Sequence, residues 1–310
     1  MWESELQFRP ELLADGLTDK HLRRMRRSGE LATVRRGAYV RAGGNGPGDH
    51  LLRVRAAMRA LSVSAVVSHV SAAALLGLPV WGMSMTQVHV IRARPTGGRR
   101  EHRLHVHALS LPADEIATVD GLAITTPGRT LVDIGRTQPF DAAVAVTDAA
   151  LHRGIVDVAE LEAAVVRARG RPGVARARRV VGFADGRSES VGESRSRVIL
   201  DRMCLPRPTP QWEVRSWRGR LLGRADFGWP ELGTVGEFDG RAKYGRLLRP
   251  GETPGDAVFA EKLREDAFRD EGLRVVRWTW ADLDNFAPVA ERLRRAFGVG
   301  VGVGVGVGVE

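Results

Sequence analysis

The chain has 310 residues, of which 43% are hydrophobic and 27% are charged, so it is long enough for two or three globular domains with sizeable cores. Its single cysteine, Cys204, excludes an internal disulfide and a cysteine-based zinc site, which fits a cytoplasmic protein. The net charge of +10 indicates a polyanionic partner, and we find no segment typical of a signal peptide or a membrane span.

The basic residues are unevenly distributed along the chain. A genome rich in G and C also raises the arginine content, so the position of the charges is more informative than their number. Residues 20–41 hold eight Lys and Arg against one acidic residue, Glu30. Residues 167–179 hold six basic residues and no acidic one, and we interpret them as a basic bridge between domains. This clustering favours nucleic acid as the partner.

Residues 1–45 are predicted to form a winged helix-turn-helix domain. Thr18 is a typical N-cap for a helix whose apolar stripe includes Leu22, and residues 31–40 alternate like a small hairpin. In such a domain the second helix enters the major groove of DNA and the wing contacts its backbone. The predicted DNA-binding residues are Lys20, Arg23, Arg24, Arg26, Arg27, Arg35, Arg36 and Tyr39.

This stretch resembles the N-terminal winged helix of AbiEi-type antitoxins. The shared patterns are Gly-Leu-Thr-x-x-x-Leu-Arg-Arg at residues 16–24 and Val-Arg-Arg-Gly-x-Tyr at residues 34–39. The resemblance implies that the chain binds DNA and has a cognate toxin as a possible partner. A solvated basic helix would explain the arginines of the first pattern but not the second.

A glycine-rich linker at residues 43–48 precedes a predicted α+β middle domain, residues 49–180, much of which also resembles the antitoxin-like proteins. His105 and His107 share a strand face, but they lack a clear third ligand. We therefore expect surface or core histidines, assign no chemistry to this domain, and expect it to couple the end domains. Helices are predicted at 51–61, 66–79, from 127 onward, at 140–153 and at 158–169, and strands at 87–91, 102–109 and 122–125.

Residues 185–297 are predicted to form an α/β domain in the order helix, strand, strand, helix, strand, ahead of a disordered Gly-Val tail at 298–310. Asp226 and Glu237 lie on two strands that form a hairpin, and Glu193 lies in the first turns of the preceding helix. Burying several carboxylates together is costly unless a cation neutralises them. Mg²⁺, or Mn²⁺ in its place, takes oxygen ligands and is the expected cofactor.

The segment from 193 to 280 resembles the very-short-patch-repair-like branch of the PD-(D/E)xK nucleases, which have a restriction-endonuclease-like fold. The matching positions are Glu193, Asp226, Glu237-Phe238-Asp239-Gly240 and the run 262–280. Asp239 stands where the pattern usually has lysine, and the resemblance implies that Lys243 or Lys262 substitutes for it. The implied metal ligands are Asp226, Glu237 and Glu193, and the implied catalytic set adds Asp239, Lys243 and Lys262.

Two functions are compatible with these patterns in an α+β protein of this organisation. The first is a DNA endonuclease that the winged helix brings to duplex DNA and that hydrolyses phosphodiesters with a bound metal ion. The alternative is a non-catalytic, antitoxin-like transcriptional regulator that keeps the nuclease-like fold as a binding surface. The three retained acids favour the enzyme, whereas Asp239 in the lysine position favours the regulator.

Overall fold

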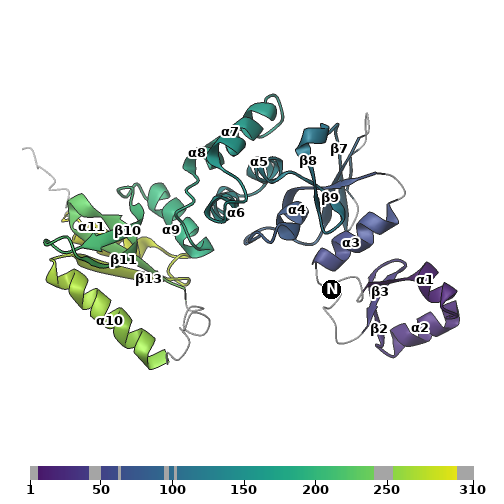
Figure 1. The fold of residues 1–310 in the computed structure, drawn as a ribbon, viewed down its shortest axis with the longest axis horizontal. Helices are drawn as coiled ribbons and strands as arrows, with labels where there is room; N and C mark the ends of the chain where they lie inside the picture. The colour runs from purple at the N-terminus through teal and green to yellow at the C-terminus, as the bar shows by residue number, and fades with distance from the viewer. Residues whose placement is uncertain are drawn as a thin grey trace, which may run out of the picture. The chain divides into compact units, whose positions relative to one another are not determined.

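The computed structural model describes residues 6–41, 50–61, 64–93, 98–100, 103–240 and 254–298, and it divides into two compact units, Met1–Phe183 and Ala184–Glu310 (Figure 1). Helices and three mixed or antiparallel sheets make it an α+β protein, as predicted. The expected linker at 43–48, Lys243 and the tail from 299 lie outside the described residues. Within the described ranges, no helix is both long and apolar enough to cross a membrane.

Residues 6–41, here called the N-terminal module, form a winged helix. Its elements are β1 (Leu6–Phe8), α1 (Arg9–Ala14), α2 (Asp19–Arg27), β2 (Leu31–Arg35) and β3 (Ala38–Arg41), with the strands antiparallel in the order β1-β3-β2. Thr18 caps α2 as predicted, because its hydroxyl accepts a hydrogen bond from the His21 backbone nitrogen at 3.3 Å. The β2–β3 turn contains Gly37 at φ +81°, a backbone conformation that glycine adopts without strain.

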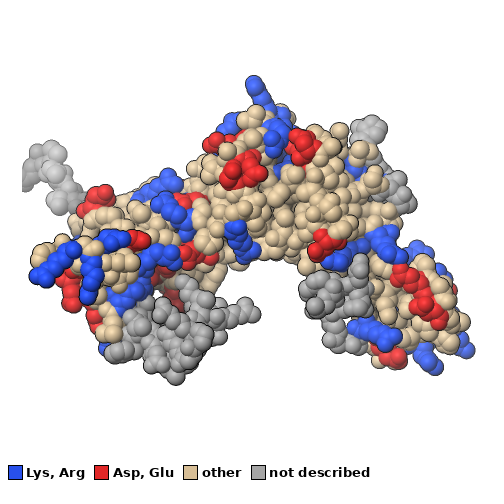
Figure 2. All heavy atoms as spheres, viewed as in Figure 1, with Lys and Arg blue, Asp and Glu red and all other residues tan. Residues whose placement is uncertain are grey.

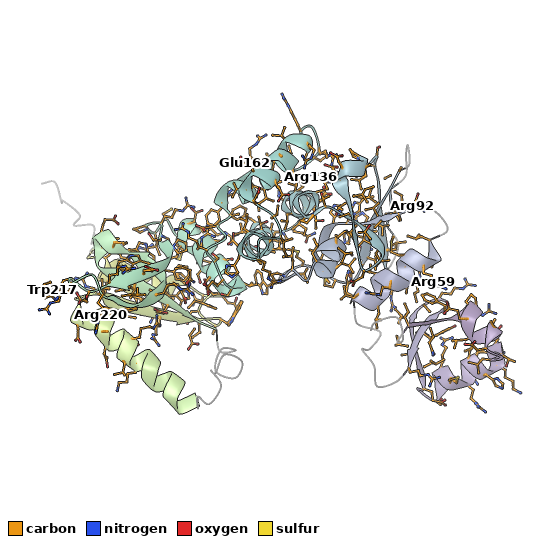
Figure 3. All side chains as sticks on the ribbon, viewed as in Figure 1. Arg59, Arg92, Arg136, Glu162, Trp217 and Arg220 are labelled. Carbon is orange, nitrogen blue, oxygen red and sulfur yellow. The ribbon has the colours of Figure 1, made fainter. Side chains whose placement is uncertain are left out.

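Helix α3 (His50–Ala60) packs against the N-terminal module. Leu52 and Ala56 belong to one buried cluster with Val34 and Val40 of the wing. Arg59, labelled in Figure 3, forms an ion pair with Glu11 on α1. The first unit therefore joins the winged helix to the middle domain, residues 50–183, through apolar packing and an ion pair.

The middle domain contains a six-stranded sheet in the order β6-β7-β5-β4-β9-β8. Its strands are β4 (Val66–Val67), β5 (Val88–Arg92), β6 (Arg99–Arg100), β7 (Leu104–Ala108), β8 (Ile116–Val119) and β9 (Leu122–Thr125). The three predicted strands are confirmed as β5, β7 and β9, whereas β6 and β8 were not predicted. Residues 66 and 67 are strand rather than helix, because they pair with β5 and β9, and α4 (His69–Leu75) starts after them.

Four helices complete this unit: α5 (Pro127–Thr137), α6 (Phe140–His152), α7 (Val158–Arg167) and α8 (Val174–Phe183). Arg129 of α5 is fully buried and pairs with Glu115 and Asp133, as a buried cation must. The basic run 167–179 is not a bridge between the two units, because it begins at the last residue of α7, ends within α8 and lies wholly inside the first unit. Ala177 and Val180 of α8 are buried in the packing of this unit.

The second unit is a four-stranded sheet, order β10-β11-β12-β13, between helices. The elements are α9 (Val191–Arg202), β10 (Thr209–Arg215), β11 (Leu221–Trp229), β12 (Thr234–Asp239), α10 (Pro254–Asp270), β13 (Arg274–Thr279) and α11 (Ala287–Ala296). The predicted β11–β12 hairpin and the order helix, strand, strand, helix, strand are confirmed within it, whereas β10 and α11 were not predicted. Figure 1 shows α10 on one side of the sheet and α11 on the other.

Candidate functional site

The basic residues predicted to bind DNA from α2 are accessible. Lys20, Arg23, Arg24, Arg26 and Arg27 are all exposed. Three of them, Arg23, Arg26 and Arg27, line one wall of a groove of 580 Å³, and residues 29 and 31–33 line the other. Lys and Arg side chains are visible on the surface of the N-terminal module in Figure 2. The arrangement places three guanidinium groups along one groove, where they can contact successive phosphates.

The wing adds a second basic surface. Arg36 is exposed and Arg35 is half-buried at the β2–β3 turn. Both line a groove of 360 Å³ together with Arg53 of α3 and Arg103, and Arg103 donates a hydrogen bond to the Val34 carbonyl at 3.1 Å. This second groove extends to the middle domain, so the basic surface includes residues of both the winged helix and the middle domain.

Tyr39 does not belong to this surface. It is 6% exposed and belongs to the core of the N-terminal module with Leu12, Leu22 and Leu31. Both faces of β3 are covered, because Ala38 and Val40 pack in a different buried cluster on the opposite side. The prediction that Tyr39 binds nucleic acid is therefore corrected: the ring stabilises the module.

Glu193 lies in the first turn of α9 and is 2% exposed. Its carboxylate accepts hydrogen bonds from the Glu189 backbone nitrogen at 2.9 Å, the Ser190 hydroxyl at 2.7 Å and the Gln211 side-chain nitrogen at 2.8 Å. Burial raises the pKa of Glu193, the Asp226 charge raises it further, and the three hydrogen bonds oppose the rise. The Asp226 charge therefore acts on the Glu193 carboxylate, and a shared metal ion at these two residues stays a prediction.

Asp226 lies where the β11–β12 ladder ends. The last paired residues of the two strands are Phe227 and Gly236. Beyond this pair, the Asp226 carboxylate accepts a hydrogen bond from the Phe238 backbone nitrogen at 2.8 Å, so a side-chain oxygen replaces the backbone carbonyl that would accept this bond in a continued ladder. The carboxylate is held at the point where the two strands separate.

Glu237 follows on β12 and is 9% exposed. Its carboxylate forms an ion pair with Arg264 of α10 at 3.2 Å, and Arg264 also donates to the Arg224 carbonyl at 2.6 Å. A protein cation therefore already neutralises this acid, so the structure gives Glu237 a stabilising partner where the sequence predicted a metal ion.

The remaining predicted catalytic residues are dispersed. Asp239 is half-buried at the end of β12, level with Thr279 of β13, and Lys262 is exposed on α10. Within the part of the chain that the structure describes, the acids do not form a group whose ligand oxygens all lie within 4.8 Å of one another. The group that meets this distance is His69, His89 and His107 of the middle domain, which the sequence interpretation missed.

Residues 64–183 match the family of AbiEi antitoxin C-terminal domains. Two uncharacterised Mycobacterium tuberculosis proteins, MT2308 of strain CDC 1551 / Oshkosh and Rv2248 of strain ATCC 25618 / H37Rv, are each 35% identical to this chain over 149 residues. The match covers 48% of this chain and 52% of each relative, so the chain spans about half the length of the curated relatives it matches.

A crystal structure of the RV2827C protein from Mycobacterium tuberculosis superposes with a TM-score of 0.41 at 19% identity, over 57% of this chain and 71% of that chain. The family match lies outside residues 193–280 and gives no support to the nuclease resemblance of that segment. Residues 64–183 of this chain are therefore similar to AbiEi antitoxin C-terminal domains.

Proposed function

We propose that the protein is a DNA-binding transcriptional regulator of the antitoxin type. The observation that carries the proposal is the groove that Arg23, Arg26 and Arg27 line beside β2, within the same compact unit as the antitoxin domain at residues 64–183. The nuclease interpretation, which the sequence placed first, is supported less well, because Glu237 is already paired with Arg264.

DNA recognition follows from the way the module holds its basic residues. Thr18 fixes the start of α2 and Leu22 anchors its buried face, so the exposed arginines are carried on a rigid helix. Guanidinium groups bind phosphate oxygens through paired hydrogen bonds and release condensed counterions. The wing residues Arg35 and Arg36 extend these contacts to the neighbouring backbone, and sequence selection requires contacts of α2 with base edges.

A cognate toxin is the second partner in this proposal, because the matched family consists of antitoxins. Co-expression of the full chain with the product of an adjacent reading frame tests it. Relief of growth inhibition by the full chain is the expected result, and unchanged inhibition at equal expression would contradict the assignment of a toxin partner.

A reporter experiment tests the regulatory function. DNA from upstream of the protein's own reading frame is fused to a reporter gene and the chain is supplied from a second promoter. We expect wild-type protein to lower reporter output and Arg35→Ala with Arg36→Ala to restore it, because two phosphate contacts are lost. Equal output with and without the wild-type chain would refute autoregulation through this DNA.

Metal-dependent phosphodiester hydrolysis is the second candidate function. The observation that favours it is the proximity of Glu193 and Asp226, which is close enough for one charge to raise the pKa of the other. These two carboxylates would hold Mg²⁺ or Mn²⁺, whereas Glu237 fits poorly because of its pairing with Arg264. The ion would supply charge stabilisation at the scissile phosphate, with Lys262 or Lys243 as the candidate assisting base.

Supercoiled plasmid incubated with the full chain, with and without Mg²⁺ or Mn²⁺, tests this candidate. Ion-dependent nicking that Asp226→Asn abolishes would support it. Intact plasmid with both ions, from protein that still shifts DNA in a gel, would leave the regulator as the function.

A further inference from the structure

Four histidines that are distant in sequence gather in the middle domain. His69 starts α4, His89 lies on β5, and His105 and His107 lie on β7. The ring centroids of His69 and His107 are 4.0 Å apart, as are those of His105 and His107, and those of His89 and His107 are 5.3 Å apart. Imidazole rings from three elements thus form one continuous cluster.

The sheet places these rings on one face. Strands β5 and β7 are parallel, and His89 is level with His105 in their register. The alternate residues Val88, Val90, Leu104 and Val106 belong to the apolar core, so the histidines project from the opposite face. Two neighbouring strands therefore supply imidazoles to a single location, and α4 adds His69 to it.

We propose that His69, His89 and His107 form a binding site for a transition-metal ion of the Zn²⁺ class. Their three ligand atoms all lie within 4.8 Å of one another. The His89 Nδ1 and His107 Nε2 atoms are 3.1 Å apart. Two nitrogens bound to one tetrahedral Zn²⁺ at 2.0–2.1 Å are about 3.3 Å apart, so this pair already has the required spacing.

The third ring has a partner for one of its two nitrogens. His69 Nδ1 lies 2.9 Å from the Ser68 hydroxyl, which would serve as an outer-sphere contact if Nε2 coordinates the ion. His69 also has φ +52°, a strained conformation for a residue with a side chain, and the fold retains it at the start of α4.

Electrostatics is consistent with neutral rings, which are the ligand form. Burial lowers the pKa of His69 well below its ordinary value, and neighbouring His89, Arg136 and Arg129 lower it further. The pKa of His107 falls to about 2, first through burial and then through His69, His105 and His89. An all-nitrogen donor set selects Zn²⁺, Co²⁺, Ni²⁺ or Cu²⁺ over Mg²⁺ and Ca²⁺.

The experiment uses full-length protein from which any affinity tag has been removed and which has been stripped with a chelator. Zn²⁺ is titrated in competition with a chromogenic chelator, and thermal unfolding is followed with Zn²⁺ or Mg²⁺. We expect one Zn²⁺ per chain and a higher melting temperature with Zn²⁺ but not with Mg²⁺, because a ligand that binds the native state stabilises it. Visible absorption typical of tetrahedral Co²⁺ that is lost with the histidine variants below would show that the ion binds at these residues.

His89→Gln with His107→Gln removes two ligands, and His152→Gln, on the exposed end of α6, is the matched control. The double variant should lose more than the roughly 10–100-fold in Zn²⁺ affinity that removal of an outer-sphere partner costs, whereas the control should bind normally. Stripped wild-type protein that binds no Zn²⁺ would overturn the proposal. Equal binding by the folded double variant would overturn it as well.

Discussion

Replacing Arg23, Arg26 and Arg27 with alanine should weaken DNA binding and flatten its dependence on salt. The three side chains are exposed and line one wall of the same groove. They lie outside the buried cluster that Leu22 forms with its neighbours, so their truncation leaves the core of the module intact. The expected loss is therefore a loss of phosphate contacts and not of folding.

The magnitude follows from counterion release. Each neutralised phosphate contributes about 0.9 to the slope of log affinity against log salt concentration, so three lost contacts lower the slope by about 2.7. The ratio of wild-type to variant affinity should then be about 40-fold larger at about 50 mM salt than at about 200 mM.

Fluorescence anisotropy with a labelled duplex, repeated over a salt series, measures the slopes. The control replaces Arg202, Arg207 and Arg292, three exposed arginines of the second unit, so that the net charge changes equally. An unchanged slope in the α2 variant would refute the placement of DNA in this groove. An equal fall in the control would assign the effect to overall charge.

Two further substitutions test the second unit. Because burial and the Asp226 charge raise the native pKa of Glu193, its ionised form costs stability above that pKa, and each pKa unit corresponds to about 1.4 kcal/mol. Glu193→Gln should therefore be more stable than wild type at pH 7 without divalent ions, with the gain vanishing below about pH 4, and a pH-independent difference in urea unfolding would contradict this. Gly192→Ala would place a Cβ 1.9 Å from the Phe238 ring, and such overpacking costs about 1–3 kcal/mol. Gly182→Ala, with open space around it, is the control, and equal denaturation midpoints by tryptophan fluorescence would refute the clash.

Local sequence patterns predicted the elements that have a clear capping residue or a regular alternation of side chains. Thr18 and the alternation of residues 31–40 predicted α2 and the wing, and both are present. Tyr39 was misassigned because the motif gives no sign that β3 is the central strand of its sheet, with both faces covered. A motif that recurs for structural reasons looks the same in sequence as one that contacts a ligand.

Long-range pairing limited the prediction of the sites. The sequence placed His105 and His107 on one strand face, but the parallel register that brings His89 level with His105 joins separate segments and leaves no local signal. Glu237 likewise has a partner from a separate segment, Arg264 of α10, that no local pattern indicates. The proximity of Glu193 and Asp226 was predictable only through the family resemblance, since local spacing does not relate α9 to β11.

The central claim is that this chain is a sequence-selective DNA-binding regulator. Competition measures it most directly: full-length protein bound to labelled DNA from upstream of its own reading frame is challenged with unlabelled copies of that DNA or of an unrelated duplex of equal length. Specific sites typically bind about 10³-fold or more tightly than non-specific DNA, so displacement should require a far larger excess of the unrelated duplex. Equal displacement by both duplexes, or no binding to either, would contradict the claim.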